Sequence, residues 1–330
     1  MTYDCFTFFN ELDLLEIRLN TLNEAVDRFV IAEATRTHRG QPKELLFEKH
    51  RARFAAFADK ITYIVVDDLL PEEDVAKDSF NLPWVNENRQ RNALARGLAG
   101  ARGDDVILVS DLDEIPRPEK VVEAVRLARQ GEIVRLVLDV FVYYANFRDY
   151  RTPRWNLGTV ALSAGTYRQG EAIGRVPCDR YTTAAESSGR CIQRVRFLRP
   201  TRRLENAGWH MTYLGGAEAV RRKLLSFSHA EAASLADRVE ERLQRGANVL
   251  GGRRDAFGVP LDASFPPYLV ANAARFSHLV FPVTADYLRR TREARRVAAA
   301  RGVLYRAAVA LVPRRLERPL SRLYRKITFR

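Results

Sequence analysis

Short runs of apolar residues alternate with segments of helical periodicity over the first part of the chain. The apolar runs are typical of buried strands, and they cover residues 3–9, 26–34, 61–66 and 106–109. The segments between them carry apolar residues at helical spacing; they begin after Asn10 and cover residues 48–58 and 84–98. This alternation predicts an α/β fold in which right-handed crossover helices join parallel strands.

The second part of the chain is less regular. We expect a helix from Pro118 to about Arg129, which Gly131 closes, and then one long strand over residues 133–144. The pattern also predicts a strand over residues 155–160 and helices over 218–226, 234–244 and from 285 to Pro313. Residues 165–195 are polar and irregular and receive no assignment. Without internal repeats, the simplest division is one catalytic domain over residues 1–284 and a helical tail over 285–330.

Polar residues follow the predicted strands at their carboxyl ends. Asn10 follows the first strand, Glu33 lies at the end of the second, and Asp67 follows the third. Parallel strands place their carboxyl ends at one edge of the sheet, and ligands of such sheets bind there. These side chains are therefore expected near one binding site.

The fourth strand ends in an Asp-x-Asp motif. The apolar residues 106–109 are followed by Ser110, Asp111 and Asp113. Successive residues of an extended chain point to opposite sides, so the spacing predicts that both carboxylates lie on one side. Such a pair suits a hard divalent cation that also binds phosphate oxygens. The alternative is a solvated acidic turn, but the buried strand before the motif and Pro116 after it favour a site.

The net charge of +13 is concentrated at the end of the chain. Residues 285–330 contain 14 basic and 3 acidic residues, which leaves a net charge of +2 on the rest. This distribution argues against a protein that binds nucleic acid over its whole surface. Three cysteines without Cys-x-x-Cys spacing indicate neither a zinc site nor a disulfide framework. No signal peptide and no apolar run of ~18 residues is found, so we expect a cytoplasmic protein.

Several motifs resemble those of the family 17 glycosyltransferases. They are Tyr3-Asp4-Cys5-Phe6, Phe9-Asn10-Glu11-Leu12-Asp13, Trp84-Val85-Asn86-Glu87-Asn88-Arg89-Gln90-Arg91-Asn92, Ser110-Asp111-Leu112-Asp113-Glu114-Ile115-Pro116, Ala207-Gly208-Trp209-His210 and Ser226-Phe227-Ser228-His229. The matches extend from about Tyr3 to Glu231. The resemblance implies a GT-A-type, Rossmann-like nucleotide-sugar transferase domain with a mostly parallel central sheet. It also implies an inverting reaction that depends on Mn²⁺ or Mg²⁺.

The resemblance suggests the substrates as well. The implied donor is UDP-N-acetylglucosamine, and the implied acceptor is a hydroxyl of a glycan or of a lipid-linked glycan. The sequence starts at the first core strand, without the N-terminal membrane anchor of the animal members. We therefore expect a bacterial-type enzyme of surface polysaccharide synthesis rather than an enzyme of the Golgi.

The same resemblance assigns roles in metal binding and catalysis. Asp111 and Asp113 would hold the metal, with a late histidine as third ligand. His229 is the first candidate for that ligand and His210 the second; a core histidine is the other interpretation of both. An inverting enzyme needs one general base, and Glu218 at a helix start is the candidate by analogy. Asp139, inside an apolar strand, is the alternative base, because burial raises the pKa of a carboxyl.

Donor and acceptor contacts are expected around the same edge. The candidates for donor binding are Phe8, Asn10, Glu11, Glu33, Arg91, Asn92 and Ser110. Arg91 would contact the diphosphate with a bidentate guanidinium, unless it is an ordinary charge on a helix surface. Trp209 would offer a flat face to the acceptor sugar, unless it belongs to the core.

The tail of residues 285–330 mixes arginines with apolar residues at helical spacing. This pattern favours a helix that lies on an anionic membrane surface, at the inner face of the cell membrane; a solvated or packed helix is the alternative. Two other functions remain open for the chain. One is a nucleotidyl- or phosphotransferase that uses the same Asp-x-Asp site. The other is a non-catalytic protein that binds nucleotide sugars or a membrane surface.

Overall fold

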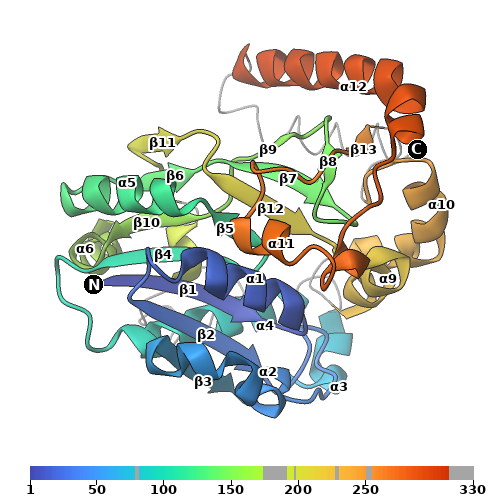
Figure 1. The fold of residues 1–330 in the computed structure, drawn as a ribbon. Helices are drawn as coiled ribbons and strands as arrows, with labels where there is room; N and C mark the ends of the chain where they lie inside the picture. Colours follow the sequence, from blue (N-terminus) through green and yellow to red (C-terminus); the bar gives the residue numbers. More distant parts are fainter. Residues whose placement is uncertain (79–81, 174–191, 197, 227–229, 250–254, 312–330) are drawn as a thin grey trace.

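The computed structural model describes residues 1–330 except 79–81, 174–191, 197, 227–229, 250–254 and 312–330. Within this part of the chain two sheets form the framework (Figure 1). The larger sheet contains the N-terminal strands, and the smaller sheet lies between it and the C-terminal helix α12 (Ala285–Leu311).

The larger sheet is mostly parallel. Its strands, in spatial order, are β11 (Arg202–Leu204), β6 (Val134–Leu136), β10 (Val160–Ser163), β4 (Val106–Asp111), β1 (Thr2–Phe8), β2 (Arg28–Ala34) and β3 (Ile61–Val66). Strands β1 to β4 pair in parallel, and β10 is antiparallel to both of its neighbours. The predicted α/β class with a mostly parallel central sheet is confirmed.

Helices cover both faces of this sheet. They are α1 (Leu12–Leu22), α2 (Leu46–Lys49), η1 (Arg51–Lys60), α3 (Glu72–Val75), η2 (Ala76–Asp78), α4 (Leu82–Ala93), η3 (Leu94–Leu98), α5 (Pro118–Arg129), α6 (Ala164–Ile173) and α8 (Ile192–Val195). Neighbouring residues of β1 point to opposite faces, so Phe6 packs with Leu15 of α1 while Cys5 packs with Leu98 of η3. Each face thus has its own apolar core.

The second sheet corrects the prediction of one long strand over residues 133–144. The chain forms β6 and then β7 (Leu138–Val142), and these two strands belong to different sheets. The sheet of β7 also contains β13 (Ala256–Gly258), β8 (Phe147–Asp149), β12 (Gly208–Thr212), β5 (Glu114–Pro116) and β9 (Arg154–Trp155). Residues 134–138 include the end of β6 and the start of β7, and all of them are buried. Hydrophobicity alone therefore could not reveal the crossing between sheets.

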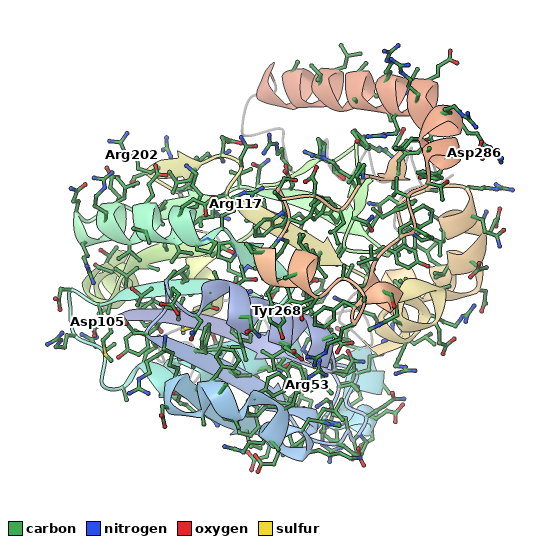
Figure 2. All side chains as sticks on the ribbon, in the orientation of Figure 1. Arg53, Asp105, Arg117, Arg202, Tyr268 and Asp286 are labelled. Atoms are coloured by element: carbon green, nitrogen blue, oxygen red, sulfur yellow. The ribbon has the colours of Figure 1, made fainter. Side chains whose placement is uncertain are left out.

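The C-terminal part adds α9 (Gly216–Ser226), η4 (Ala230–Arg238), α10 (Val239–Gln244), α11 (Pro267–Ala271), η5 (Ser277–Leu279) and α12. Glu16 of α1 fastens this part to the first sheet. Its carboxylate accepts hydrogen bonds from Arg53 of η1, from Tyr268 of α11 and from Arg275. Arg53 and Tyr268 approach α1 from different elements (Figure 2).

Helix α12 packs against the smaller sheet, far from α2 and β3 (Figure 1). Thr291 and Ala298 are buried in this contact. A Cβ atom at Gly302 would lie 2.1 Å from the carbonyl oxygen of Tyr150, so only glycine permits this approach. The beginning of the predicted basic tail is thus a packed helix. None of the described helices combines the length and the apolar character that a membrane crossing requires.

Candidate active site

A buried arginine fixes the loop that follows β4. Arg18 of α1 is fully buried and forms a salt bridge with Asp4 of β1, at 2.6 Å. The same guanidinium donates to Ser110 Oγ and to the carbonyl oxygens of Asp111, Leu112 and Glu114. The chain turns here, so these carbonyls leave the sheet and need another donor. Arg18 supplies that donor and holds the turn in place.

This turn changes the interpretation of the Asp-x-Asp motif. Strand β4 ends at Asp111. The next two residues, Leu112 and Asp113, form a turn, and Glu114 begins β5 in the other sheet. The motif is therefore not extended, and the argument from alternating side chains does not apply to it. The two carboxylates nevertheless lie close enough that the charge of Asp113 acts to raise the pKa of Asp111, against the stronger effect of its basic neighbours.

Asp111 lies between two arginines. Arg91 of α4 contacts its Oδ1 and Arg196 contacts its Oδ2, each at 2.5 Å. Burial alone would raise the pKa of Asp111, but the charges of Arg196 and Arg91 outweigh it and lower the pKa to about 2. This carboxylate is ionised throughout the physiological range.

Asp113 has its own pair of basic partners. Lys223 of α9 lies 3.1 Å from Oδ2, and His210 Nε2 of β12 lies 3.5 Å from Oδ1. Burial opposes ionisation, yet Lys223 and His210 together hold the pKa of Asp113 well below its usual range. In turn Asp113 and Glu11 raise the pKa of Lys223, although burial acts in the opposite direction. Lys223 is therefore a permanent cation beside the motif.

Glu114 is the third carboxyl of the cluster. It is fully buried, and its Oε1 accepts hydrogen bonds from Trp155 Nε1 and from Arg196, each at 2.6 Å. Burial and the charge of Asp111 raise its pKa, although Arg196 opposes this shift. Glu114 thus has the opposite tendency to Asp111 and Asp113, because it is fully buried, is paired with the single cation Arg196 and lies near the charge of Asp111.

The donor atoms in this cluster are of the kind that Mn²⁺ or Mg²⁺ binds. Asp111 and Asp113 offer carboxylate oxygens, and Nδ1 of His210 is buried without a hydrogen-bond partner in the described part of the chain. Among the described residues, however, no three acidic, histidine or cysteine side chains converge into a metal-binding cluster. The carboxylates contact cations instead. His229, the other predicted ligand, lies outside the described residues.

The structure distributes the predicted donor-binding residues between the site and the interior. Arg91 contacts the motif directly, and Glu11 at the start of α1 lies 3.7 Å from Lys223. Asn10 follows β1 at the same edge, and its backbone N–H donates to Glu11. Asn92 is the next residue of α4 and is half-buried. The carboxyl ends of β1 and β4 therefore do lie together, as their parallel pairing requires.

Three other predicted donor-binding residues belong to the interior. Phe8 is 1% exposed and packs in the core on the α1 face of the sheet. Glu33 is fully buried and accepts hydrogen bonds from Lys43, from Tyr63 and from two backbone N–H groups. The hydroxyl of Ser110 accepts a hydrogen bond from Arg18. The expectation that ligands bind at the carboxyl ends of parallel strands identified the correct edge of the sheet. It did not predict which side chains at that edge point into the core.

The two predicted bases occupy different places. Glu218 lies in the first turn of α9, where its side chain is 72% exposed and pairs with Arg221. Asp139 of β7 is buried and contacts Arg148 and Arg154, each at 3.1 Å. It pairs in register with Trp209, so both side chains point to the face opposite His210. Asp139 and Trp209 are therefore not brought to the Asp-x-Asp motif.

Four residues that sequence reasoning missed complete the cluster: Arg18, Glu114, Arg196 and Lys223. Glu114 was part of the recognised motif, so its position next to Asp113 was a usable signal. Lys223 and Arg196 come from segments more than 80 residues later, and nothing in their surroundings marks them.

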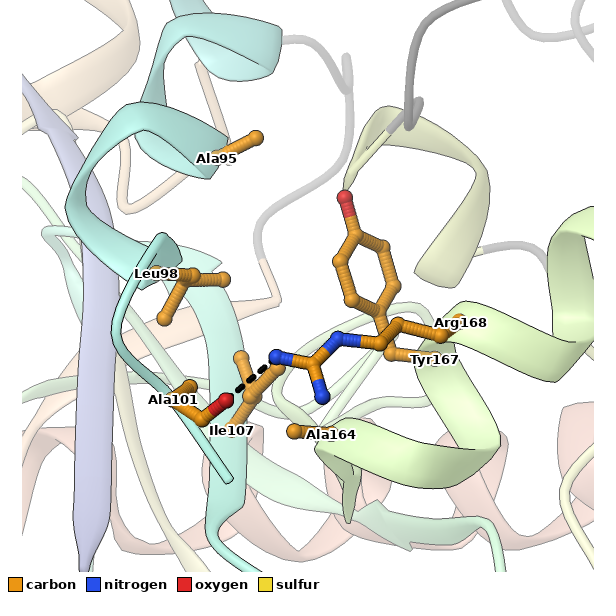
Figure 3. A pocket seen from close by; sticks show the side chains of 7 residues that line it. All are labelled: Ala95, Leu98, Ala101, Ile107, Ala164, Tyr167 and Arg168. Atoms are coloured by element: carbon orange, nitrogen blue, oxygen red, sulfur yellow. Dashed lines mark hydrogen bonds between the residues drawn. The ribbon is translucent and has the colours of Figure 1, made fainter. Parts of the chain in front are cut away.

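A separate small cavity lies between η3 and α6. It has a volume of about 10 Å³, and Leu98, Ile107, Tyr167 and Arg168 are among its lining residues (Figure 3). Arg168 donates to the carbonyl of Ala101 there. This volume is enough for about one water molecule and not for a nucleotide.

Comparison with known proteins identifies the class of this molecule. The family model for glycosyltransferase family 17 matches residues 1–169, about half of the chain. The chain belongs to glycosyltransferase family 17, and the predicted resemblance is confirmed.

Relatives in mammals share a limited region with the chain. The beta-1,4-mannosyl-glycoprotein 4-beta-N-acetylglucosaminyltransferases of Homo sapiens and Rattus norvegicus are each 30% identical over 118 residues. That region is 34% of this chain and 21% of each relative, so the match spans about a fifth of the relatives' length.

Solved structures show only a distant likeness. The galactosyltransferase LgtC in complex with donor and acceptor sugar analogues has a TM-score of 0.34 at 12% identity, over 87% of this chain and 99% of that chain. A 4-diphosphocytidyl-2C-methyl-D-erythritol synthase has a TM-score of 0.33 at 14% identity, over 62% of this chain and 88% of that chain.

Proposed function

We propose that the protein is an inverting glycosyltransferase that moves N-acetylglucosamine from UDP-N-acetylglucosamine to a hydroxyl of a glycan or lipid-linked acceptor. One observation carries this proposal. The carboxylates of Asp111 and Asp113, at the carboxyl end of β4, are surrounded by Arg91, Arg196 and Lys223. Family membership sets the reaction class, and the named activity of the mammalian relatives supports the choice of donor.

The proposed donor diphosphate binds beside these cations. Breaking the bond between the anomeric carbon and the diphosphate leaves negative charge on the leaving group, which fixed positive charges stabilise. The guanidinium of Arg91 or Arg196 can contact two phosphate oxygens at once, and Lys223 acts as a point charge. Since these cations now neutralise Asp111 and Asp113, a bound diphosphate competes with the carboxylates for them.

A divalent cation would relieve that competition, and metal dependence is therefore part of the proposal. Mn²⁺ or Mg²⁺ would be held by Asp111 and Asp113, with His210 or His229 as a further ligand. When bound, such an ion would stabilise the negative charge of the leaving diphosphate. The carboxylates would then face the metal, and the arginines would be free to face the phosphates.

Glu218 is the proposed general base, because Asp139, the other candidate, lies on the opposite face of the smaller sheet from Asp113. An exposed carboxylate in the first turn of α9 is on the same helix as Lys223, which contacts Asp113. The two residues are five positions apart, so they do not share one face of the helix. For Glu218 to reach the acceptor hydroxyl, the acceptor must bind over the start of α9.

The remaining parts of the proposal concern the location of the enzyme. The described part of α12 exposes Val297, Val303 and Leu304 next to its arginines. This combination supports docking on the anionic inner face of the cell membrane and an acceptor that is lipid-linked.

A donor screen tests the proposed reaction. Purified protein is incubated with nucleotide sugars and Mn²⁺, and the release of free nucleotide is followed with and without EDTA. We expect the fastest release from UDP-N-acetylglucosamine, and loss of release with EDTA. Nucleotide turnover without transfer of a sugar would favour a nucleotidyl- or phosphotransferase. Donor binding without any turnover would favour a non-catalytic protein.

The base is tested by Glu218→Gln. We expect this variant to lose sugar transfer while it still binds the donor. Glu119→Gln is the matched control, because Glu119 is an exposed carboxylate in the first turn of another helix, α5. Near-normal turnover by Glu218→Gln would remove Glu218 from the mechanism.

A further inference from the structure

A second cavity lies on the face of the smaller sheet that points away from the Asp-x-Asp motif. Its volume is about 250 Å³, and Asp139 and Trp209 line it together with residues from α12 and from the loop before α11. His210, the neighbour of Trp209 in β12, points the other way and contacts Asp113. The sheet therefore separates this cavity from the proposed donor site.

Three arginines from three different elements line the cavity. Arg117 precedes α5, Arg148 belongs to β8, and Arg295 belongs to α12. Arg117 lies near β5 and β12 (Figure 2). The guanidinium of Arg117 lies 4.3 Å from the ring centre of Trp209, and that of Arg295 donates to the hydroxyl of Tyr150. Aromatic rings thus hold the cationic groups at the wall of the cavity.

The charges of the cavity do not cancel. Three arginines and two aspartates line the cavity, and Asp139 is also paired with Arg154 outside it. Asp262 accepts hydrogen bonds from Ser264 and keeps its negative charge. Among the described residues, neither Arg117 nor Arg295 forms an ion pair with a carboxylate. The side chain of Arg117 donates to two backbone carbonyls, those of Asn206 and Ser264. The cavity therefore presents an excess of positive charge whose natural complement is an anion.

We propose that this cavity binds the phosphate group of a second ligand, distinct from the nucleotide-sugar donor. A carboxylate is matched by one guanidinium fork, whereas the oxygens of a phosphate can accept from several arginines that approach from different directions. The volume suits a single phosphate or a phosphorylated sugar and is below the range of larger ligands. The phosphate could belong to a soluble sugar phosphate or to a lipid headgroup.

The test uses inorganic phosphate, glucose 1-phosphate and vesicles of phosphatidic acid, with phosphatidylcholine vesicles as the neutral comparison. Binding of the soluble probes is followed by ³¹P NMR and binding of vesicles by sedimentation, each without UDP and with saturating UDP, which fills the proposed donor site. Wild-type protein is compared with Arg295→Gln. The matched control is Arg292→Gln, because Arg292 lies on the exposed side of the same helix.

We expect Arg295→Gln to bind phosphate about tenfold more weakly, the loss typical of one charged hydrogen bond, and Arg292→Gln to bind the soluble probes like wild type. Selective loss of the soluble probes identifies a sugar phosphate, and a loss of phosphatidic acid vesicles that exceeds the loss in Arg292→Gln identifies a lipid headgroup. Arg148→Lys, which keeps the charge next to Asp139, should show an intermediate loss. Equal binding by wild type and Arg295→Gln, or complete loss of binding when UDP is added, would overturn the proposal. Both results are independent of sugar transfer at the Asp-x-Asp site.

Discussion

Replacing Arg18 by methionine removes the group that holds the Asp-x-Asp turn. The side chain forms six hydrogen bonds, two to Asp4, one to Ser110 and three to backbone carbonyls of the turn. Methionine has a similar length and no donors. The variant therefore keeps the packing volume and loses the charge and every one of these bonds.

The loss of stability follows from the buried charge that the variant leaves unpaired. Asp4 is fully buried, so Arg18→Met leaves a carboxylate in the interior without its cation. Removing one partner of such a buried pair costs about 3–5 kcal/mol of the free energy of unfolding. Because the total for a folded domain is about 5–15 kcal/mol, the variant should be severely destabilised. The double variant Asp4→Leu/Arg18→Met should regain part of the loss, since no buried charge remains.

Urea unfolding followed by tryptophan fluorescence measures this loss, by linear extrapolation to water. Arg102→Met is the matched control, because the side chain of Arg102 is 73% exposed and its ion pairs are long, at 3.9 Å. The free energy of unfolding of this control should fall by less than about 0.5 kcal/mol. A loss below about 1 kcal/mol for Arg18→Met would refute the assignment of Arg18 as the anchor of the turn.

Three further predictions concern the site and the fold. Lys223→Met should raise the KM for the donor by about tenfold, because a diphosphate would lose a permanent cation; an unchanged KM in steady-state kinetics would contradict this. Gly302→Ala should lower the melting temperature, since its Cβ would meet the carbonyl of Tyr150, and thermal unfolding would show whether that contact exists. Burial acts to raise the pKa of Asp13, but hydrogen bonds from Arg53 and His278 outweigh it and lower the pKa. The stability that Asp13 contributes is therefore present above about pH 4 and lost as the pH falls further, so unfolding of Asp13→Asn should depend less on pH in that acidic range.

The local pattern of the sequence predicted those elements whose environment is simple. Helix α5 has the predicted bounds, with Pro118 at its start and Gly131 in the left-handed conformation just after its end. Strand β3 also has its predicted bounds, and β4 begins at the predicted residue, because turn residues flank their apolar runs. These signals are local, and no contact with a distant segment changes the elements that they predict.

Other features depend on contacts between distant segments. The hydrophobic pattern of the sequence does not show where β6 ends and β7 begins, because both strands are buried. The helix predicted over residues 48–58 is largely a 3₁₀ helix, η1, and the one predicted over 234–244 is divided between η4 and α10. Residues 165–195 received no assignment, although part of this stretch forms α6 and α8.

The candidate site shows the same division. Asp111 and Asp113 were identified because a buried strand precedes them in the sequence. Arg196 and Lys223 reach them only through the fold, so their charges could not be anticipated. The inward orientation of Phe8 and Glu33 likewise depends on which face of the sheet is covered by α1 and α2.

The proposed site is tested most directly by the transfer of labelled N-acetylglucosamine from UDP-N-acetylglucosamine by Asp113→Asn, measured with Mn²⁺ at equal concentrations of folded protein. We predict a loss of at least about 100-fold, as expected when a ligand of the metal that would stabilise the leaving diphosphate is removed. Asp104→Asn, at a side chain that is 77% exposed just before β4, should keep the wild-type rate. Transfer by Asp113→Asn at close to the wild-type rate would contradict the claim that this edge of the sheet is the site of sugar transfer.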